Sequence, residues 1–332
     1  MKYRIAVIGT GYMAEKHCSM LKNNNQVVLD TIVSTKKSEK YSKEFIQKYG
    51  FKKNSTKLDT VLHDQNIDIA IICSPDYLHA EQTIKLLESG KHVLCEKPLA
   101  RTKKDFQLVK KTLTKSQKIL QVGMNCRFRE QYSKAKKIID DGKLGELRVI
   151  HGEYLVNIVD TMKKREKEWW KKYPKNIYPI LHGGAIHCID LIRWNGGKIK
   201  RVCARSTSLG LEGLGDDTFL ISLEFENGII GNCYVSASEM KPNSFHIDYS
   251  LTKGSIIKNT QIFQTKNNQP KFTKEIVIKQ KIIDLRLQFR DMLESIKTEK
   301  EPMNSFNEAY ENYKLISLIE ESIRKDKVIN AS

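Results

Sequence analysis

The chain has 332 residues, 40% of them hydrophobic and 29% charged, and it carries a formal net charge of +18. This composition is typical of a soluble globular protein with one large or two smaller domains, and the length allows a sizeable buried core. No apolar run approaches the length of a membrane span, which excludes a membrane-spanning protein.

The positive charge could attract nucleic acid or acidic ligands. The lysines are spread over most of the chain, however, and neither zinc-finger spacing nor an aromatic RNA-binding signature is present. The densest run, Lys163–Lys172, mixes acids, bases and aromatics, and it could bind a phosphorylated ligand or form a solvated loop or helix. We therefore expect neither nucleic acid nor a membrane as a partner.

The first residues lead directly into a predicted strand, with no signal peptide or anchor visible. The seven cysteines are scattered and form no CxxC pair. Because free thiols are typical of reducing compartments, the sequence predicts reduced cysteines and a cytoplasmic location.

The first predicted strand, Tyr3–Ile8, is followed by a glycine-rich turn and then by apolar residues at helical spacing, Ala14, Cys18 and Leu21. The turn has the form GxGxxA between a strand and a helix, which is typical of dinucleotide binding. The phosphates of the bound dinucleotide would face the N-terminus of this helix. The predicted cofactor-binding residues are Gly9, Thr10, Gly11, Tyr12 and Met13.

The second predicted strand, 26–33, ends in Ser34, Thr35, Lys36 and Lys37. NAD-specific folds usually place a carboxylate near this point to bind the adenosine ribose. Its absence, together with the two lysines, favours the 2′-phosphate of NADP. NAD is the alternative, if the lysines are only solvated or if a different register brings Asp30 to the ribose.

A third buried strand, 67–72, precedes Ser74, Pro75 and His79, which are predicted to lie at the same edge of the sheet as the glycine turn. His79 could touch the cofactor or could have only a packing role. The next strand, His92–Cys95, ends in a turn formed by Glu96, Lys97 and Pro98, and a fifth strand covers 119–122. Predicted helices alternate with these strands, which indicates a doubly wound parallel sheet.

The pattern changes after this strand, and we place a domain boundary near Gly123. The predicted domains are a dinucleotide-binding Rossmann domain, 1–123, and a substrate-binding and oligomerisation α+β domain, 124–332. Asn125 and Arg127 are candidate substrate residues, although Arg127 could instead form an ion pair that braces the domain junction. A helix with Tyr132, Ala135 and Ile139 on one face precedes a predicted strand at 147–154.

A second group of chemically active side chains follows in the stretch 181–194. His187 and Asp190 are one helical turn apart, and a histidine suits proton transfer because its unperturbed pKa is about 6.5. His187 could also be a packed core histidine. Metal binding by His182, His187 and Asp190 fits no standard helical zinc spacing, so no metal site is predicted.

The remainder predicts strands at 201–209, 217–225, 229–237 and 245–251, with a hairpin turn at Asn227–Gly228. These strands indicate a large, mainly antiparallel sheet with one face on the helix of His187. The other face is expected to bury against a second copy of the chain. Two amphipathic helices, 285–296 and 307–323, close the chain.

The chain resembles the Gfo/Idh/MocA family of NAD(P)-dependent oxidoreductases, the glucose-fructose oxidoreductase and inositol dehydrogenase group. The segments that carry the resemblance are Gly9–Gly11, Ser74–Pro75 with His79, Gly90–Leu99 and Gly123–Phe128. The resemblance implies hydride transfer to or from a sugar, inositol, sugar acid or nucleotide-linked sugar. It implies that Lys97 lies beside the nicotinamide and binds the reacting oxygen, that Glu96 belongs to the cofactor site, and that His187 is a general acid or base. It also implies a homodimer or homotetramer formed through the C-terminal sheet.

The sequence departs from the family pattern at Gly183, where many members have an aspartate. His182 or Tyr154 could take its place, and the candidate substrate-binding residues are Asn125, Arg127, Tyr154, His182 and Asp190. Two other functions remain open. The chain could be an NAD(P)-binding sensor without turnover, or an enzyme that uses bound NAD for net non-redox chemistry such as elimination or glycoside cleavage.

Overall fold

The computed structural model describes residues 2–159, 178–210, 216–266, 269–276 and 285–331. It divides into two compact units, Met1–Asn125 with Ile282–Tyr310 and Cys126–Lys281 with Glu311–Ser332. The lysine-rich run Lys163–Lys172 lies outside the described residues. In the part of the chain that is described, no helix is both long and apolar enough to cross a membrane.

The first unit contains a six-stranded parallel sheet of order β3-β2-β1-β4-β5-β6, which confirms the predicted doubly wound Rossmann fold. Its strands are β1 (Tyr3–Ile8), β2 (Val27–Val33), β3 (Lys53–Ser55), β4 (Ile69–Ile72), β5 (His92–Cys95) and β6 (Leu120–Val122). Its helices are α1 (Tyr12–Leu21), α2 (Glu39–Tyr49), α3 (Asp59–Leu62), α4 (His79–Glu88) and α5 (Lys103–Ser116), with 3-10 turns η1 (Lys36–Ser38) and η2 (Asp76–Leu78). The central strands are apolar and buried because helices cover both faces of such a sheet.

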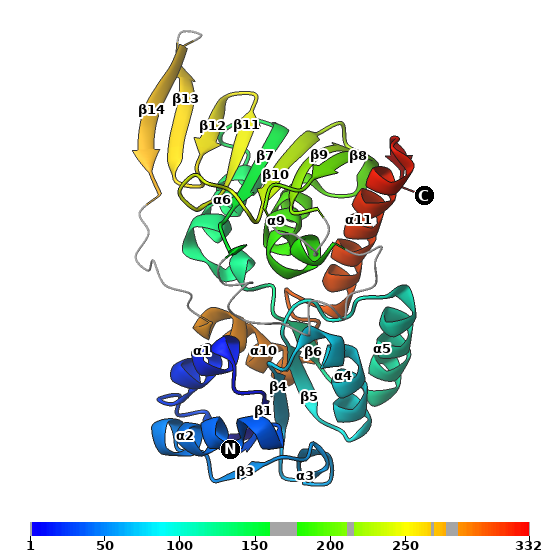
Figure 1. Cartoon of the computed structure of the whole chain (residues 1–332). Coiled ribbons are helices and arrows are strands. Elements are labelled where there is room, and N and C mark those ends of the chain that lie inside the picture. Colours follow the sequence, from blue (N-terminus) through cyan, green and yellow to red (C-terminus); the bar gives the residue numbers. More distant parts are fainter. Residues whose placement is uncertain (1, 160–177, 211–215, 267–268, 277–284, 332) are drawn as a thin grey trace. The chain divides into compact units, whose positions relative to one another are not determined.

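Helix α10 (Arg286–Thr298) belongs to this first unit, although it lies late in the sequence (orange in Figure 1). Its Phe289, Met292 and Leu293 are buried in the same hydrophobic core as Ile5 of β1 and Leu29 of β2. The predicted domain boundary near Gly123 lies two residues before the end of the first segment of this unit, at Asn125. Residues 282–310, which the sequence assigns to the second predicted domain, belong instead to the first unit. Helical periodicity identifies a buried face and not the sheet that buries it.

The second unit contains a nine-stranded sheet of order β14-β13-β12-β11-β7-β10-β9-β8-β15. Its strands are β7 (Leu147–Leu155), β8 (Ile199–Thr207), β9 (Thr218–Phe225), β10 (Ile230–Ser236), β11 (Ser244–Leu251), β12 (Gly254–Ile257), β13 (Gln261–Lys266), β14 (Gln269–Glu275) and β15 (Ile329–Asn330). β7 and β10 pair in parallel and the other neighbours are antiparallel. The sheet is therefore mixed and mainly antiparallel, as predicted, and β9 and β10 form the expected hairpin.

The other elements of this unit are η3 (Asn125–Phe128), α6 (Glu130–Asp140), the π-helical turn η4 (Leu181–Ala185), α9 (Ile186–Gly196) and α11 (Phe306–Lys325), two of which begin in the first unit. Helix α9 packs on β7, β10 and β11 (Figure 1). Gly152 of β7 allows this close approach, because a Cβ there would lie 2.6 Å from Cys188 Sγ and from Ile192 Cδ1. We call the side of the sheet opposite α9 the outer face.

Candidate active site

The glycine turn after β1 has the geometry that a dinucleotide requires. Gly9 has a φ of +109°, and a Cβ there would lie 2.5 Å from the carbonyl oxygen of Cys73. Gly11 is exposed and stands immediately before α1, and a Cβ at Gly11 would have no atom within 4 Å. The turn thus leaves open space in front of a ten-residue helix, and helix N-termini bind phosphate. Thr10, Tyr12 and Met13 complete this turn, so the residues present fit a bound pyrophosphate.

The exposed side chains after β2 begin at Thr35, one residue later than the predicted cofactor residue Ser34. Ser34 is buried, and its hydroxyl lies 3.2 Å from Ser42 Oγ. Thr35, Lys36 and Lys37 are exposed, and Thr35 caps η1 by accepting from the backbone N–H of Ser38. Any contact with a ribose or a 2′-phosphate would therefore involve Thr35 and the lysines rather than the Ser34 side chain.

Asp30 does not reach this region. It is fully buried and forms an ion pair with Arg4, with 2.7 Å between Asp30 Oδ2 and Arg4 Nη2. This burial and the ion pair with Arg4 favour a structural role for Asp30 over contact with a ribose.

The turn after β5 is held by a buried pair. Glu96 Oε1 lies 2.9 Å from His17 Nε2 on α1, and both side chains are buried. Gly123 makes room for this carboxylate, because a Cβ there would lie 2.7 Å from Glu96 Oε2. The predicted cofactor residue Glu96 thus points inward and links the lysine turn to the helix that follows the glycine turn.

His79 connects the turns after β4 and β5. Its Nδ1 lies 2.8 Å from the carbonyl oxygen of Pro98 and its Nε2 lies 2.8 Å from that of Ser74. Burial opposes protonation of His79, but the Cys95 thiol and the two carbonyls favour it, and its pKa is raised to about 9. Since both ring nitrogens already contact backbone oxygens, this geometry favours the bracing role of His79 over contact with a cofactor. The Ser74 hydroxyl in turn donates to Gln82.

Lys97 follows Glu96 directly and is half-buried. Its turn lies at the carboxyl end of β5, and the glycine turn and Ser74 follow β1 and β4 at the same edge of the sheet. In open parallel sheets this edge binds ligands. Asn125 follows β6 at this edge too, and it is buried.

In the second unit, His187 lies in the first turn of α9, directly after the π-helical turn η4. π-helical turns occur frequently at functional sites. His187 is half-buried, whereas its neighbours Ile186 and Cys188 are buried. Tyr154 of β7 packs against the backbone of this turn, because a Cβ at Gly184 would overlap the Tyr154 hydroxyl. Burial raises the pKa of Tyr154 to about 12, so it keeps its proton.

Arg127 and Asp190 lie against each other rather than in an open pocket. Arg127 Nε and Nη2 donate to the two carboxylate oxygens of Asp190 over 2.9 and 2.5 Å, and Asn312 Nδ2 donates to Oδ1 over 2.7 Å. All three side chains are buried. This bidentate contact is an ion pair within the second unit, so it favours a structural role for Arg127 but does not brace the junction between the domains.

His182 is likewise engaged inside the second unit. Its Nε2 lies 3.1 Å from Glu320 Oε1 of α11, and the same oxygen accepts from the backbone N–H of Tyr178. His182 therefore links η4 to α11, whereas the Tyr154 hydroxyl lies against the backbone of Gly184.

Sequence reasoning missed His17, Asn312 and Glu320. His17 could have been found, because it lies between Ala14 and Cys18 on the buried side of a short helix. Asn312 and Glu320 carry no local signal, since each acquires its role only through a partner more than a hundred residues away.

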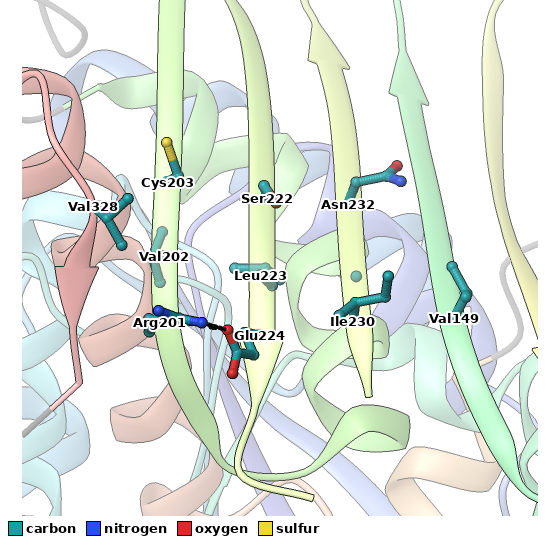
Figure 2. A pocket seen from close by; sticks show the side chains of 11 residues that line it. Val149, Arg201, Val202, Cys203, Ser222, Leu223, Glu224, Ile230, Asn232 and Val328 are labelled. Carbon is teal, nitrogen blue, oxygen red and sulfur yellow. Dashed lines mark hydrogen bonds and ion pairs between the residues drawn. The ribbon is translucent and has the colours of Figure 1, made fainter. Parts of the chain in front are cut away.

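Two cavities are formed by described residues outside the turns discussed above. One of about 570 Å³ borders His92, Lys118 and Phe306 at the amino ends of β5 and β6. Another of about 320 Å³ is lined by side chains of β7, β8, β9 and β10. Figure 2 shows this second cavity, with Ile230, Asn232 and Val149 projecting from adjacent strands and Arg201 paired with Glu224.

Two family models match the sequence. Residues 3–124 match an oxidoreductase family described as a NAD-binding Rossmann fold, and residues 132–257 match the GFO/IDH/MocA C-terminal domain. Together these matches cover most of both units.

Similar proteins include two dehydrogenases. The 4-carboxy-2-hydroxymuconate-6-semialdehyde dehydrogenase of Sphingobium sp. is 28% identical over 323 residues, 97% of this chain and 99% of that protein. The myo-inositol 2-dehydrogenase of Thermotoga maritima is 28% identical over 238 residues, 69% of this chain and 66% of that protein. A solved levoglucosan dehydrogenase in complex with NADH superposes with a TM-score of 0.85 at 20% identity and covers 100% of both chains. This last likeness establishes the fold.

Proposed function

The chain belongs to the Gfo/Idh/MocA family of oxidoreductases, and from that premise we propose that it is an NAD(P)-dependent dehydrogenase. The proposed reaction moves a hydride between C4 of the nicotinamide and a substrate carbon that bears a hydroxyl. The proposed substrate is a sugar, an inositol, a sugar acid or a nucleotide-linked sugar. The named activity of the Thermotoga relative supports a polyol.

One observation supports this proposal above the others. The buried contact between His17 and Glu96 joins the first helix after the glycine turn to the turn that carries Lys97. His79 joins the same turn to the loop of Ser74. A phosphate-binding turn and an ammonium group are thereby held at one edge of one sheet, which is where positioned charge is useful for catalysis.

The nicotinamide, when bound, supplies the group that accepts or donates the hydride. In the oxidation direction, His187 accepts the proton of the substrate hydroxyl, directly or through a relay. The Lys97 ammonium stabilises the negative charge that develops on that oxygen. Each contribution is worth a factor of roughly 10² to 10³ in rate. In the reverse direction His187 returns the proton to the carbonyl oxygen.

We propose NADP(H) as the preferred cofactor, with NAD(H) as the alternative. The exposed residues after β2 are Thr35, Lys36 and Lys37, none of which is acidic. Two ammonium groups attract a 2′-phosphate, and none of these three side chains carries a negative charge that would repel it.

We propose that the outer face of the nine-stranded sheet covers a second copy of the chain. Leu220 of β9 and Ile230 of β10 are 63% and 54% exposed on this face, and the cavity of Figure 2 lies beside Ile230. Exposed apolar side chains on neighbouring strands are typical of an interface. Sedimentation velocity is expected to show a dimer or tetramer that Leu220→Lys dissociates.

The seven free cysteines support a reducing, cytoplasmic location for the protein.

A substrate screen tests the function. Sugars, polyols, sugar acids, nucleotide sugars and aldehyde-bearing acids are each offered with NADP⁺ and with NAD⁺, and reduced nicotinamide is followed by absorbance. We expect one chemical class to be oxidised. Substrate loss without release of reduced cofactor would assign net non-redox chemistry instead, and tight cofactor binding without turnover of any class would favour a sensor.

A further inference from the structure

Four residues form a compact block on the outer face, at the centre of the nine-stranded sheet. His151 and Glu153 are two residues apart on β7, so their side chains share one face. On the neighbouring strand β11, Asp248 pairs with His151 and His246 pairs with Glu153. The two histidines and the two carboxylates therefore occupy the opposite diagonals of a two-by-two block.

The side chains of this block converge. One ligand atom each from His151, Glu153 and His246 lies within 4.8 Å of the others, and all three side chains are half-buried. The distance between His246 Nδ1 and Glu153 Oε1 is 3.9 Å. A tetrahedral zinc ion with bonds of about 2.0–2.2 Å holds its ligand atoms roughly 3.4 Å apart. The ligand atoms must therefore move closer together when zinc binds.

One of the two histidines, His151, also has the hydrogen-bonded outer partner that a metal-binding imidazole needs. The Nδ1 of His151 contacts the amide oxygen of Asn232 on β10, and Figure 2 shows this amide directed toward β7. Because an amide oxygen only accepts, Nδ1 carries the proton and Nε2 keeps a lone pair. Such outer-shell partners fix the tautomer and the orientation of metal-binding histidines.

His246 has a more distant acidic neighbour on its Nε2 side. Its Nε2 lies 3.9 Å from Asp248 Oδ1, and its Nδ1 lies 3.0 Å from the Ser244 hydroxyl. With a proton on Nε2, the Nδ1 atom carries the lone pair, which accepts from the Ser244 hydroxyl. A zinc ion bound to Nδ1 would therefore take the place of this hydroxyl. The two rings, with centroids 6.3 Å apart, thus each present a basic nitrogen to the same space.

From this arrangement we propose that His151, His246 and Glu153 bind one zinc ion per chain, with water in the fourth position. Two imidazoles and one carboxylate are a zinc donor set, whereas magnesium and calcium select oxygen ligands. The site is separate from the residues assigned to the dehydrogenase reaction, and it does not depend on that proposal.

Titration of the full-length, chelator-treated protein with zinc tests the site, and cobalt provides a spectroscopic report. We expect one zinc per folded chain and, with Co²⁺, the visible absorption of a four-coordinate ion. His151→Ala and His246→Ala are each expected to weaken zinc binding at least 100-fold. His63→Ala removes a histidine outside the block and is expected to leave the affinity unchanged. Sedimentation velocity checks that all proteins have the same oligomeric state, and circular dichroism checks that they are all folded.

Two milder variants keep the test decisive if a histidine variant fails to fold. Glu153→Gln retains the side-chain shape and Asn232→Ala alters only an exposed outer partner, and each is expected to weaken binding about tenfold. The proposal is overturned if folded wild-type protein binds no stoichiometric zinc. It is also overturned if these variants and the histidine variants bind zinc as tightly as the wild type.

Discussion

The Nε2 of His17 lies 2.9 Å from Oε1 of Glu96, and both side chains are buried in the first unit. In the part of the chain that the structure describes, His17 Nδ1 is buried without a hydrogen-bond partner. The contact therefore uses Nε2 as the donor and Glu96 as the acceptor. It couples α1, which would bind the cofactor phosphates, to the turn of Lys97.

Removal of His17 is expected to disturb the turn of Glu96 and Lys97, although the substituted residue lies on α1 and outside that turn. His17→Ala leaves the Glu96 carboxylate buried and unpaired, which costs about 1–3 kcal/mol of stability. We expect kcat to fall and cofactor binding to weaken, each by roughly tenfold. A factor of ten corresponds to a loss of about 1.4 kcal/mol, which lies within this range. His17→Gln restores a donor and should recover most of both. A fully active His17→Ala protein would show that the contact has no role in positioning.

Lys97 is expected to act on the chemical step. Lys97→Ala should lower kcat at least about 100-fold and leave the Kd of the cofactor nearly unchanged, because in the proposed mechanism the ammonium acts on the reacting oxygen in the chemical step. Lys103→Ala, which removes an exposed lysine from the start of α5, is the matched control. Equal turnover in the two variants would remove Lys97 from the mechanism.

His187 is expected to determine the acidic limb of the pH profile. A general base must be neutral, so in the oxidation direction the wild-type kcat/KM should fall at low pH as this histidine is protonated. His187→Gln should lower kcat by roughly 10² to 10⁴ and remove that limb. An unchanged profile in the variant would assign the proton transfer to another group.

The pair of Arg127 and Asp190 is expected to support stability rather than substrate affinity. Asp190→Asn leaves a buried guanidinium without its counterion, which costs about 3–5 kcal/mol. Asp140→Asn, which breaks an exposed pair with Lys136, should cost less than about 0.5 kcal/mol. Urea denaturation measures both. A stable Asp190→Asn protein with a greatly raised KM would favour direct contact with the substrate instead.

His79 should make the first unit less stable as the pH rises. Its pKa is about 9 when folded and about 6.5 when unfolded. The stabilisation by its protonated form is therefore complete below pH 6.5 and is lost as the pH rises through 9, on the order of 3 kcal/mol at most. Denaturation of wild type and His79→Gln between pH 6 and 9 checks this. The difference between the two proteins reports His79 together with its interaction with Cys95, and a difference independent of pH would contradict the prediction.

Thr35 tests the proposed cofactor preference better than Ser34, whose side chain is buried. Thr35→Asp places a carboxylate where a 2′-phosphate is expected, and it should weaken NADPH binding by about tenfold to 100-fold relative to NADH. Thr35→Asn has the same size without the charge and should change little. Calorimetry with NADPH and NADH measures the preference of each protein. A wild-type preference for NADH would show that Lys36 and Lys37 do not select the cofactor.

The sequence by itself determined the doubly wound alternation of strands and helices, the glycine turn, the hairpin at Asn227–Gly228 and the placement of Lys97 at the end of a strand, but not the strand β3 or the strand order. Each of these follows from local rules, since burial on both faces selects apolar strands and a positive φ selects glycine. Candidate chemistry could likewise be located wherever a strand ends or a helix begins.

Only the tertiary structure decided which polar side chains meet. His17 and Glu96 are 79 residues apart, Arg127 and Asp190 are 63 apart, and His151 and His246 lie on strands that pair only within the folded sheet. Hydrophobic periodicity states that a face is buried but not by what, which is why α10 joins the first unit and why Ser34 points inward. The partners of a buried charge are set by packing between distant segments, and no local pattern encodes them.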